Sequence, residues 1–189
     1  MDLERDRRRL AEILRQRSVR TGEEFVLASG RRSNVYVDAR TTTLYAEAMP
    51  LIGRLFLAKM RERKWRPGAV GGLTLGADPI VAAIARESLE ASPPVNAFLV
   101  RKETKKHGLQ KQIEGLIEKP PLDVVVVEDV ATTGGSAAQA IAACREAGLG
   151  VLGVVALVDR EEGAAQAIEN DWQCPFDSIF RLRDLLPTE

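Results

Sequence analysis

The most constraining feature of this sequence is a hydrophobic run that leads into two acids and a small polar loop, Val-Val-Val-Val-Glu-Asp-Val-Ala-Thr-Thr-Gly-Gly-Ser at residues 124–136. Consecutive valines predict a strand that is buried on both faces, because a half-exposed strand would alternate polar and apolar residues. The next segment, residues 136–147, is rich in helix-forming residues and ends before Gly148. We therefore expect the polar loop to join the carboxyl end of a central parallel strand to the amino end of a helix.

A loop in that position is suited to holding a phosphate group. The unpaired N–H groups of the first helical turn and the positive end of the helix dipole attract anions. The hydroxyls of Thr132, Thr133 and Ser136 add donors. The loop is not the nucleoside triphosphate-binding loop, because no lysine follows its glycines. The adjacent carboxylates of Glu128 and Asp129 can accept hydrogen bonds from the ribose hydroxyls of a sugar phosphate.

This pattern resembles the signature of the type I phosphoribosyltransferases, which use phosphoribosyl pyrophosphate (PRPP) as the donor. In that family two acids contact the ribose hydroxyls and the loop binds the 5-phosphate, so the resemblance implies these roles for Glu128, Asp129 and residues 131–136. It also implies a catalytic role for Asp129. An ordinary strand-to-helix junction with a Thr-Gly cap is the alternative, and the complete pattern disfavours it. The implied PRPP-binding residues of this signature are Glu128, Asp129, Val130, Ala131, Thr132, Thr133, Gly134, Gly135 and Ser136.

Length and composition exclude several classes of protein. The 189 residues are enough for one α/β domain with a small appendage. The 27 basic and 27 acidic side chains cancel, so no global field recruits nucleic acid. The start of the chain is charged, unlike a signal peptide, and the longest apolar run, residues 151–158, is far shorter than the about 20 residues of a membrane span. With Cys144 and Cys174 as the only thiols, we expect a cytoplasmic protein that binds neither nucleic acid nor membranes.

Alternating strand and helix patterns predict the fold class. Hydrophobic spacing indicates a helix around residues 10–14, and two short strands flank a turn-rich link at residues 28–34. Strands are expected at residues 24–27, 35–38, 69–73, 95–101, 122–128 and 151–158, and helices at residues 51–60, 78–88 and 136–147. This alternation around a buried strand predicts an α/β protein with a doubly wound, mainly parallel sheet. Such sheets bind ligands outside the carboxyl ends of their strands.

A long cationic connection follows the strand expected at residues 95–101. From Arg101 to Lys111, six cationic or potentially cationic side chains are opposed by one acid. Long connections of this kind are often functional lids. A cationic lid suits a pyrophosphate leaving group, because the negative charge of that group grows as its bond breaks. In isolation, a solvated basic loop is the alternative interpretation.

The string Arg-Lys-Glu-Thr-Lys-Lys-His-Gly at residues 101–108 resembles the flexible catalytic loop of the orotate phosphoribosyltransferase family. The resemblance implies that the pyrophosphate of PRPP is contacted by Arg101, Lys102, Lys105 and His107. It also implies catalytic roles for Lys105 and His107. Histidine titrates near neutral pH, so His107 is suited to donate a hydrogen bond or a proton to the leaving group. Because this loop works partly across subunits in the family, the resemblance implies a homodimer with shared active sites.

Arg160 is the candidate residue for binding the acceptor. It follows the strand expected at residues 151–158, where its planar fork can hold a carboxylate. An ion pair with Glu161 or Glu162 explains the residue equally well. In the orotate family, the arginine of the matching Val-Asp-Arg-x-x-Gly string binds orotate. The resemblance therefore implies that Arg160 binds orotate, and we expect Thr132 to be its polar companion.

Two further segments resemble the same family. The glycine-rich turn at residues 71–79 offers backbone N–H groups to pyrophosphate, although a tight turn before a helix explains it nearly as well. Residues 25–38 resemble the N-terminal hood that closes over the base, with Ala28 where many members have lysine and with Tyr36 either in the base pocket or in the core. We expect an N-terminal helix and hood strands in residues 1–45 and a phosphoribosyltransferase α/β core in residues 46–189, within a single domain overall.

Together these resemblances imply the activity of the orotate phosphoribosyltransferase family, which serves pyrimidine (UMP) biosynthesis. This pentosyltransferase reaction moves the phosphoribosyl group from PRPP to orotate and yields orotidine 5'-monophosphate and pyrophosphate. Mg²⁺ is the expected cofactor, held through PRPP without a direct protein ligand. Two alternatives stay open. A phosphoribosyltransferase for a neutral base would have no carboxylate for Arg160, and a PRPP-sensing regulator on the same fold should lose the lid and gain a basic face.

Overall fold

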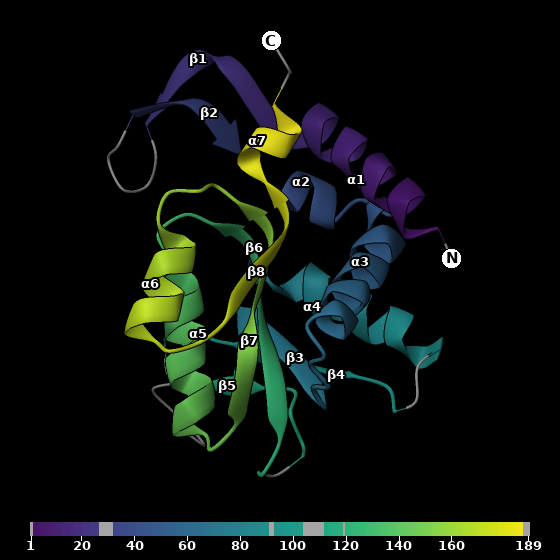
Figure 1. The fold of residues 1–189 in the computed structure, drawn as a ribbon, viewed down its shortest axis with the longest axis vertical. Helices are drawn as coiled ribbons and strands as arrows, with labels where there is room; N and C mark the ends of the chain where they lie inside the picture. The colour runs from purple at the N-terminus through teal and green to yellow at the C-terminus, as the bar shows by residue number, and fades with distance from the viewer. Residues whose placement is uncertain (1, 27–31, 91–92, 104–111, 119, 187–189) are drawn as a thin grey trace.

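A six-stranded sheet with the order β5-β4-β3-β6-β7-β8 organises the computed structural model, which describes residues 2–26, 32–90, 93–103, 112–118 and 120–186 (Figure 1). Its strands are β3 (Ala69–Leu73), β4 (Asn96–Val100), β5 (Ile113–Glu114), β6 (Asp123–Ala131), β7 (Gly150–Asp159) and β8 (Phe176–Arg181). Only the pairing of β5 with β4 is antiparallel among these strands. The predicted doubly wound, mainly parallel α/β sheet is therefore confirmed.

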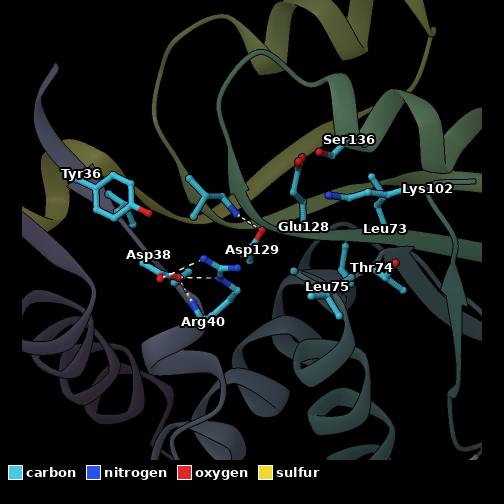
Figure 2. A pocket seen from close by; sticks show the side chains of 17 residues that line it. Tyr36, Asp38, Arg40, Leu73, Thr74, Leu75, Lys102, Glu128, Asp129 and Ser136 are labelled. Carbon is cyan, nitrogen blue, oxygen red and sulfur yellow. Dashed lines mark hydrogen bonds and ion pairs between the residues drawn. The ribbon is translucent and has the colours of Figure 1, made fainter. Parts of the chain in front are cut away.

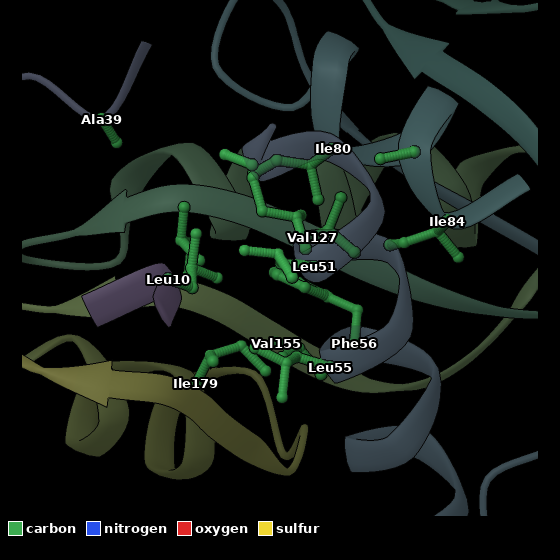
Figure 3. Close-up of a cluster of buried hydrophobic side chains, with 14 of the residues drawn as sticks. Leu10, Ala39, Leu51, Leu55, Phe56, Ile80, Ile84, Val127, Val155 and Ile179 are labelled. Atoms are coloured by element: carbon green, nitrogen blue, oxygen red, sulfur yellow. The ribbon is translucent and has the colours of Figure 1, made fainter. Parts of the chain in front are cut away.

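The valines of β6 are buried because both faces of the sheet are covered. Val125 and Val127 belong to a hydrophobic cluster with residues of three helices, α1 (Leu3–Arg17), α3 (Ala48–Glu62) and α4 (Asp78–Glu87). Figure 3 shows part of this cluster around Phe56. On the other face, Val124 and Val126 pack with α5 (Gly135–Glu146) and α6 (Ala164–Asp171). Alternate valines thus serve opposite cores, which is why the sequence of β6 shows no polar alternation.

The N-terminal strands form a separate two-stranded sheet. β1 (Val19–Val26) pairs antiparallel with β2 (Arg32–Val37), and Figure 1 shows them at one end of the molecule, near the short helix α2 (Arg40–Thr43). The prediction placed the first of these strands at residues 24–27, but β1 begins at Val19. Its first half escaped the sequence pattern because its side chains are mostly exposed and polar. We call this strand pair the hood.

The N-terminal helix packs on the core and not on the hood alone. Leu10 and Leu14 of α1 are fully buried in the same cluster as Phe56 of α3. The proposed division at residue 45 remains a prediction about the organisation of a single domain. Among the described residues, no helix combines the length and the apolar character required to cross a membrane.

Several elements were not predicted. The strand expected to end at residue 128 continues to Ala131, because β7 pairs with β6 as far as Ala131 opposite Asp159. β5 lies in the connection that was expected to be without structure, and its pairing with β4 is a tertiary contact. The other missed elements are α2, α6, β8, the 3-10 helix η1 (Ser88–Glu90) and α7 (Leu182–Leu185). All of them are short or weakly periodic in hydrophobicity, so local sequence carries little signal for them.

Candidate active site

A cavity of about 250 Å³ lies where the carboxyl ends of β3 and β6 approach the end of β2 (Figure 2). One wall is the β3–α4 turn, residues 73–77, and another is the end of β6, residues 127–130. The third wall comes from residues 36–40, which lead from the hood into α2. Lys102, Ser136 and Ala137 complete the lining. Parallel sheets place ligand sites at this edge, so the cavity occupies the predicted location.

Glu128 is a buried acid whose carboxyl group lacks a full set of partners. Glu128 is 8% exposed, and no described group donates a hydrogen bond to its Oε2. Burial and the neighbouring charge of Asp129 raise the pKa of Glu128 to about 8, while the hydroxyl of Ser136 acts in the opposite direction. Figure 2 shows the Glu128 carboxyl beside Ser136 at the cavity. An unpaired buried acceptor of this kind is suited to a ligand hydroxyl.

Asp129 lies next to the glycine-rich turn. Its Oδ1 accepts a hydrogen bond from the backbone N–H of Val130 at 2.9 Å, and burial is the main cause that raises the pKa of its carboxyl. A Cβ added at Gly76 would overlap the Asp129 carboxylate, well inside van der Waals contact. The Thr74–Leu75 peptide bond in this turn is cis. The predicted second glycine-rich segment therefore faces the acids directly, and glycine is required at residue 76 for this approach.

The loop predicted to bind phosphate leads into α5, as expected from the sequence. Gly134 has φ +85°, a left-handed conformation that favours glycine, and α5 starts at the next residue. Its first turn presents N–H groups that have no partner within the helix. Ser136 lines the cavity together with Glu128, Asp129 and Val130, whereas residues 131–135 do not line it. Thr132 is half-buried and Thr133 is exposed on the loop.

Only the start of the predicted lid falls within the described residues. Lys102 lines the cavity, and its backbone carbonyl accepts a hydrogen bond from Nε2 of Gln139 in α5 at 2.6 Å. Arg101 does not line the cavity; its Nε donates to Glu114 of β5 at 2.9 Å. Lys105 and His107 lie outside the described residues, as does Ala28 of the hood. Among the predicted lid cations within the described residues, Lys102 is therefore the one that lines the cavity with the β6 acids.

Arg160 joins the end of β7 to the hood. Its Nε donates to Oε1 of Glu162 at 2.7 Å, which is one of the two ion pairs weighed from the sequence. The other guanidinium nitrogens lie 3.3 Å from Oγ of Ser33 and 3.4 Å from the backbone carbonyl of Val35. Arg160 is 7% exposed and is not part of the cavity lining. Its contact with orotate remains a prediction, and Tyr36 and Val37 are the described hood residues that line the cavity.

Two charged residues of the cavity were missed by sequence reasoning. Asp38 and Arg40 lie just after β2, and Nε of Arg40 donates to Oδ1 of Asp38 at 2.9 Å. Nothing in their local sequence distinguishes them from a surface ion pair. Only the packing of the hood against the core brings them opposite the β6 acids.

The raised pKa of Glu128 predicts how stability depends on pH. A folded-state pKa of about 8, against 4.5 for the ordinary side chain, means that the native protein binds more protons than the unfolded chain between these values. The free energy of unfolding should therefore be highest below pH 4.5 with respect to this group and fall as the pH rises to about 8. The slope for one group is at most about 1.4 kcal/mol per pH unit. In urea unfolding, the free energy of unfolding of the Glu128→Gln protein should fall less steeply between pH 4.5 and about 8 than that of the wild-type protein. An equal slope for the two proteins would contradict the raised pKa of Glu128.

No metal ligand cluster is evident in the described part of the chain. The described residues contain no group of three or more His, Cys, Asp or Glu side chains arranged to hold a metal ion. The orphaned oxygen of Glu128 and the neighbouring carboxylate of Asp129 instead offer acceptors for hydroxyl groups. This donor set fits a cation that arrives already bound to a sugar pyrophosphate.

Comparisons with known proteins agree with each other. A protein named orotate phosphoribosyltransferase from Aquifex aeolicus (strain VF5) is 48% identical over 183 residues, which cover 96% of this chain and 98% of that protein. The crystal structure of Mycobacterium tuberculosis H37Rv orotate phosphoribosyltransferase in complex with Fe(III) dicitrate superimposes with a TM-score of 0.82 at 45% identity, covering 95% of this chain and 98% of that one. The structure of the same mycobacterial enzyme in complex with PRPP gives a TM-score of 0.79 at 42% identity, with 95% and 98% coverage. No family model matches the chain.

Proposed function

This chain belongs to the orotate phosphoribosyltransferase family, and from that membership we propose how its residues perform the reaction. The enzyme is a pentosyltransferase that transfers the phosphoribosyl group of PRPP to orotate, yielding orotidine 5'-monophosphate and pyrophosphate in pyrimidine biosynthesis. The observation that carries the assignment of residues is the pair of acids at the end of β6, the buried Glu128 and the half-buried Asp129, which line the cavity with the glycine turn and the start of α5. The assignments below are our proposals.

The β6 acids and the phosphate loop hold the donor. Glu128 and Asp129 accept hydrogen bonds from the ribose hydroxyls, and residues 131–136 bind the 5-phosphate through backbone N–H groups and hydroxyls. The orphaned Oε2 of Glu128 supports this role. As the C1–O bond breaks, positive charge develops on the ribose, and nearby carboxylates stabilise it.

The leaving pyrophosphate is held by the glycine turn and the lid. Residues 74–77 and Lys102 line the cavity, which supports contact of the turn and of the Lys102 side chain with the departing oxyanions. The backbone N–H groups of Thr74 and Ala77 already donate to the carbonyls of Val100 and Leu73, so Leu75 and Gly76 are the turn residues proposed for this contact. Arg101, Lys105 and His107 complete this set in our proposal. Lys105 and His107 supply charge and a proton donor as the negative charge grows. Because the departing charge is the main requirement, no protein nucleophile is needed.

The acceptor binds between the core and the hood. Arg160 and Thr132 bind orotate in our proposal, and Tyr36 lines the cavity at its hood side. The Arg160 guanidinium donates to Glu162 and to the hood strand β2, which fixes its position at the end of β7.

Mg²⁺ accompanies the donor in this proposal. Bound to the pyrophosphate and ribose hydroxyls of PRPP, it would neutralise charge on the leaving group. Glu128 and Asp129 would orient its ligands through the ribose hydroxyls and not bind the ion directly. Glu128 and Asp129 both line the cavity and offer carboxyl acceptors to the two ribose hydroxyls, which supports this arrangement.

The active enzyme is a homodimer with shared active sites in our proposal. Lys105→Ala and Arg160→Ala proteins should each have little activity, because one lacks a lid contact and the other an acceptor contact. Mixing them after subunit exchange should restore part of the activity, since a hybrid dimer contains one site with both residues intact. Steady-state rates before and after mixing measure this, with each variant mixed with itself as the control. A mixture no more active than its components would contradict sharing.

We propose that the enzyme works in the cytoplasm with small-molecule substrates. Cys144 and Cys174 are free and buried, and burial raises the pKa of Cys144 to about 12. Unreactive thiols without a disulfide are typical of a reducing compartment. The equal numbers of basic and acidic residues give no support for a nucleic acid partner.

The decisive experiment is turnover of orotate. The protein mixed with PRPP, orotate and Mg²⁺ should consume orotate and release pyrophosphate, which absorbance and a coupled pyrophosphate assay measure independently. Hypoxanthine and uracil serve as matched acceptors and should not react. Turnover of either of them without turnover of orotate would overturn the assignment of the acceptor. Donor binding without turnover of any base would instead favour the PRPP-sensing regulator.

A further inference from the structure

Arg40 is a cationic residue at the cavity that has no role in the reaction proposed above. Its side chain is 52% exposed, and it lies on the cavity wall formed by residues 36–40. Figure 2 shows its guanidinium between Asp38 and Asp129, on the side of the acids away from Lys102. The two cationic side chains that line the cavity within the described residues, Arg40 and Lys102, thus flank the β6 acids.

The guanidinium of Arg40 is oriented by Asp38. Nε donates to Oδ1 at 2.9 Å and Nη2 donates to Oδ2 at 3.2 Å, so the carboxylate occupies one edge of the guanidinium. The backbone N–H of Arg40 also donates to Oδ1 at 3.2 Å. Within the described part of the chain, no acceptor is assigned to Nη1. Donors on the outer edge are therefore left for a group that enters the cavity.

The backbone that carries Arg40 is tied to the core. The Thr41 hydroxyl lies within hydrogen-bonding distance of two carbonyls, that of Asp38 at 2.9 Å and that of Arg17 at 2.8 Å, which share its single proton. The hydroxyl of Ser18 lies 2.6 Å from that of Thr42, and both of these residues are buried. The backbone and the guanidinium of Arg40 are therefore both held in place, and little conformational entropy is lost when the side chain binds an anion.

We infer that Arg40 is a further substrate-binding residue, which holds an oxyanion of a substrate at the hood side of the cavity while Asp38 orients its guanidinium. This inference rests on the proposed function, because both substrates of that reaction are anionic. The oxyanion is an oxygen of the donor's pyrophosphate or the carboxylate of the acceptor. Either group carries the planar or multiple oxygen acceptors that match an arginine fork. Asp38 acts as a positioning residue.

Separate binding measurements test the inference and identify the oxyanion. Calorimetry should compare the wild-type protein with Arg40→Gln and Arg40→Lys, using pyrophosphate with Mg²⁺ in one arm and orotate in the other. We expect Arg40→Gln to weaken one of the two ligands by about 10- to 100-fold. The affinity of the Arg40→Lys protein for that ligand should lie between those of the wild-type and Arg40→Gln proteins. Lysine keeps the positive charge but lacks the planar guanidinium. The ligand that weakens is the one that Arg40 holds.

The matched control is Arg32→Gln. Arg32 is also paired with a carboxylate, that of Glu24, and also belongs to the hood region, but it does not line the cavity. Its substitution should leave both dissociation constants unchanged. If Arg40→Gln likewise leaves both unchanged while the protein stays folded by thermal unfolding, the inference is overturned. Lack of orotate turnover by the wild-type protein would count against the proposed function alone, since pyrophosphate binding is measured without turnover.

Discussion

Replacing Asp129 with asparagine is expected to lower kcat/KM for PRPP by about 100-fold, while the protein remains folded. The substitution keeps the shape of the side chain and removes the charge that accepts hydrogen bonds from the ribose. A charge-assisted hydrogen bond contributes about 1.5–3 kcal/mol, and about 1.4 kcal/mol corresponds to a tenfold change in rate. The carboxylate is also expected to stabilise positive charge on the ribose in the transition state, so kcat should fall as well as kcat/KM.

The matched control for this variant lies on the same strand. Asp123 is the first residue of β6, is exposed and does not line the cavity. Asp123→Asn makes the same chemical change at the opposite end of the strand and should alter kcat/KM less than about twofold, as surface substitutions usually do. Initial rates at saturating orotate with varied PRPP give the comparison. Equal losses for the two variants would show that the effect arises from general damage to β6 and not from the lost ribose contact.

The second prediction concerns Gly76→Ala, in the turn that lies against Asp129, and we expect this substitution to lower activity strongly. The Cβ of Gly76→Ala would overlap the Asp129 carboxylate, so that either the glycine turn or the acid must move. Displacement of a reacting group by about 1 Å can cost on the order of 100-fold in rate. We therefore expect kcat/KM to fall by about that factor. Thermal unfolding should change little, because Gly76 is only half-buried and the turn lies at the cavity surface.

A double-mutant cycle identifies the cause of that loss. If Gly76→Ala acts by displacing Asp129, it should cost far less activity in a protein that already carries Asp129→Ala, because the clashing carboxylate is absent. The two losses would then be strongly non-additive, as expected for residues in contact. Additive losses would mean that the methyl group acts by another route, for example by blocking the turn N–H groups from pyrophosphate.

The local sequence predicts the donor half of the site because its parts are contiguous. A buried strand, two acids, a loop of hydroxyls and glycines and a helix start follow one another within residues 124–147, so covalent connection alone places them together. Many strands and helices of the core were predicted for the same reason, since hydrophobic periodicity reports which face of each element is buried. The end of β6 at Ala131 and the strands β5 and β8 were missed, and each of these pairs with a segment that is distant in the chain.

The surroundings of the residues proposed for the acceptor were less predictable, because they are assembled from separate segments. Arg160 follows the pattern of a carboxylate-binding arginine, yet its guanidinium contacts depend on Ser33 and Val35, which are more than 120 residues away in the chain. From the sequence alone, Arg40 and Asp38 cannot be distinguished from a surface ion pair. The structure shows that both residues line the cavity. No periodicity or spacing encodes these contacts.

The sequence by itself determined the fold class and predicted where and by what chemistry the donor binds, because each of these depends on neighbours along the chain. Only the tertiary structure decided that Gly76 lies against Asp129, that Glu128 is buried enough to have a pKa of about 8, and that the hood brings Arg40 opposite Lys102. These properties depend on close packing between elements far apart in sequence. Desolvation and steric contact are set by what surrounds a group in space, which residue order alone does not specify.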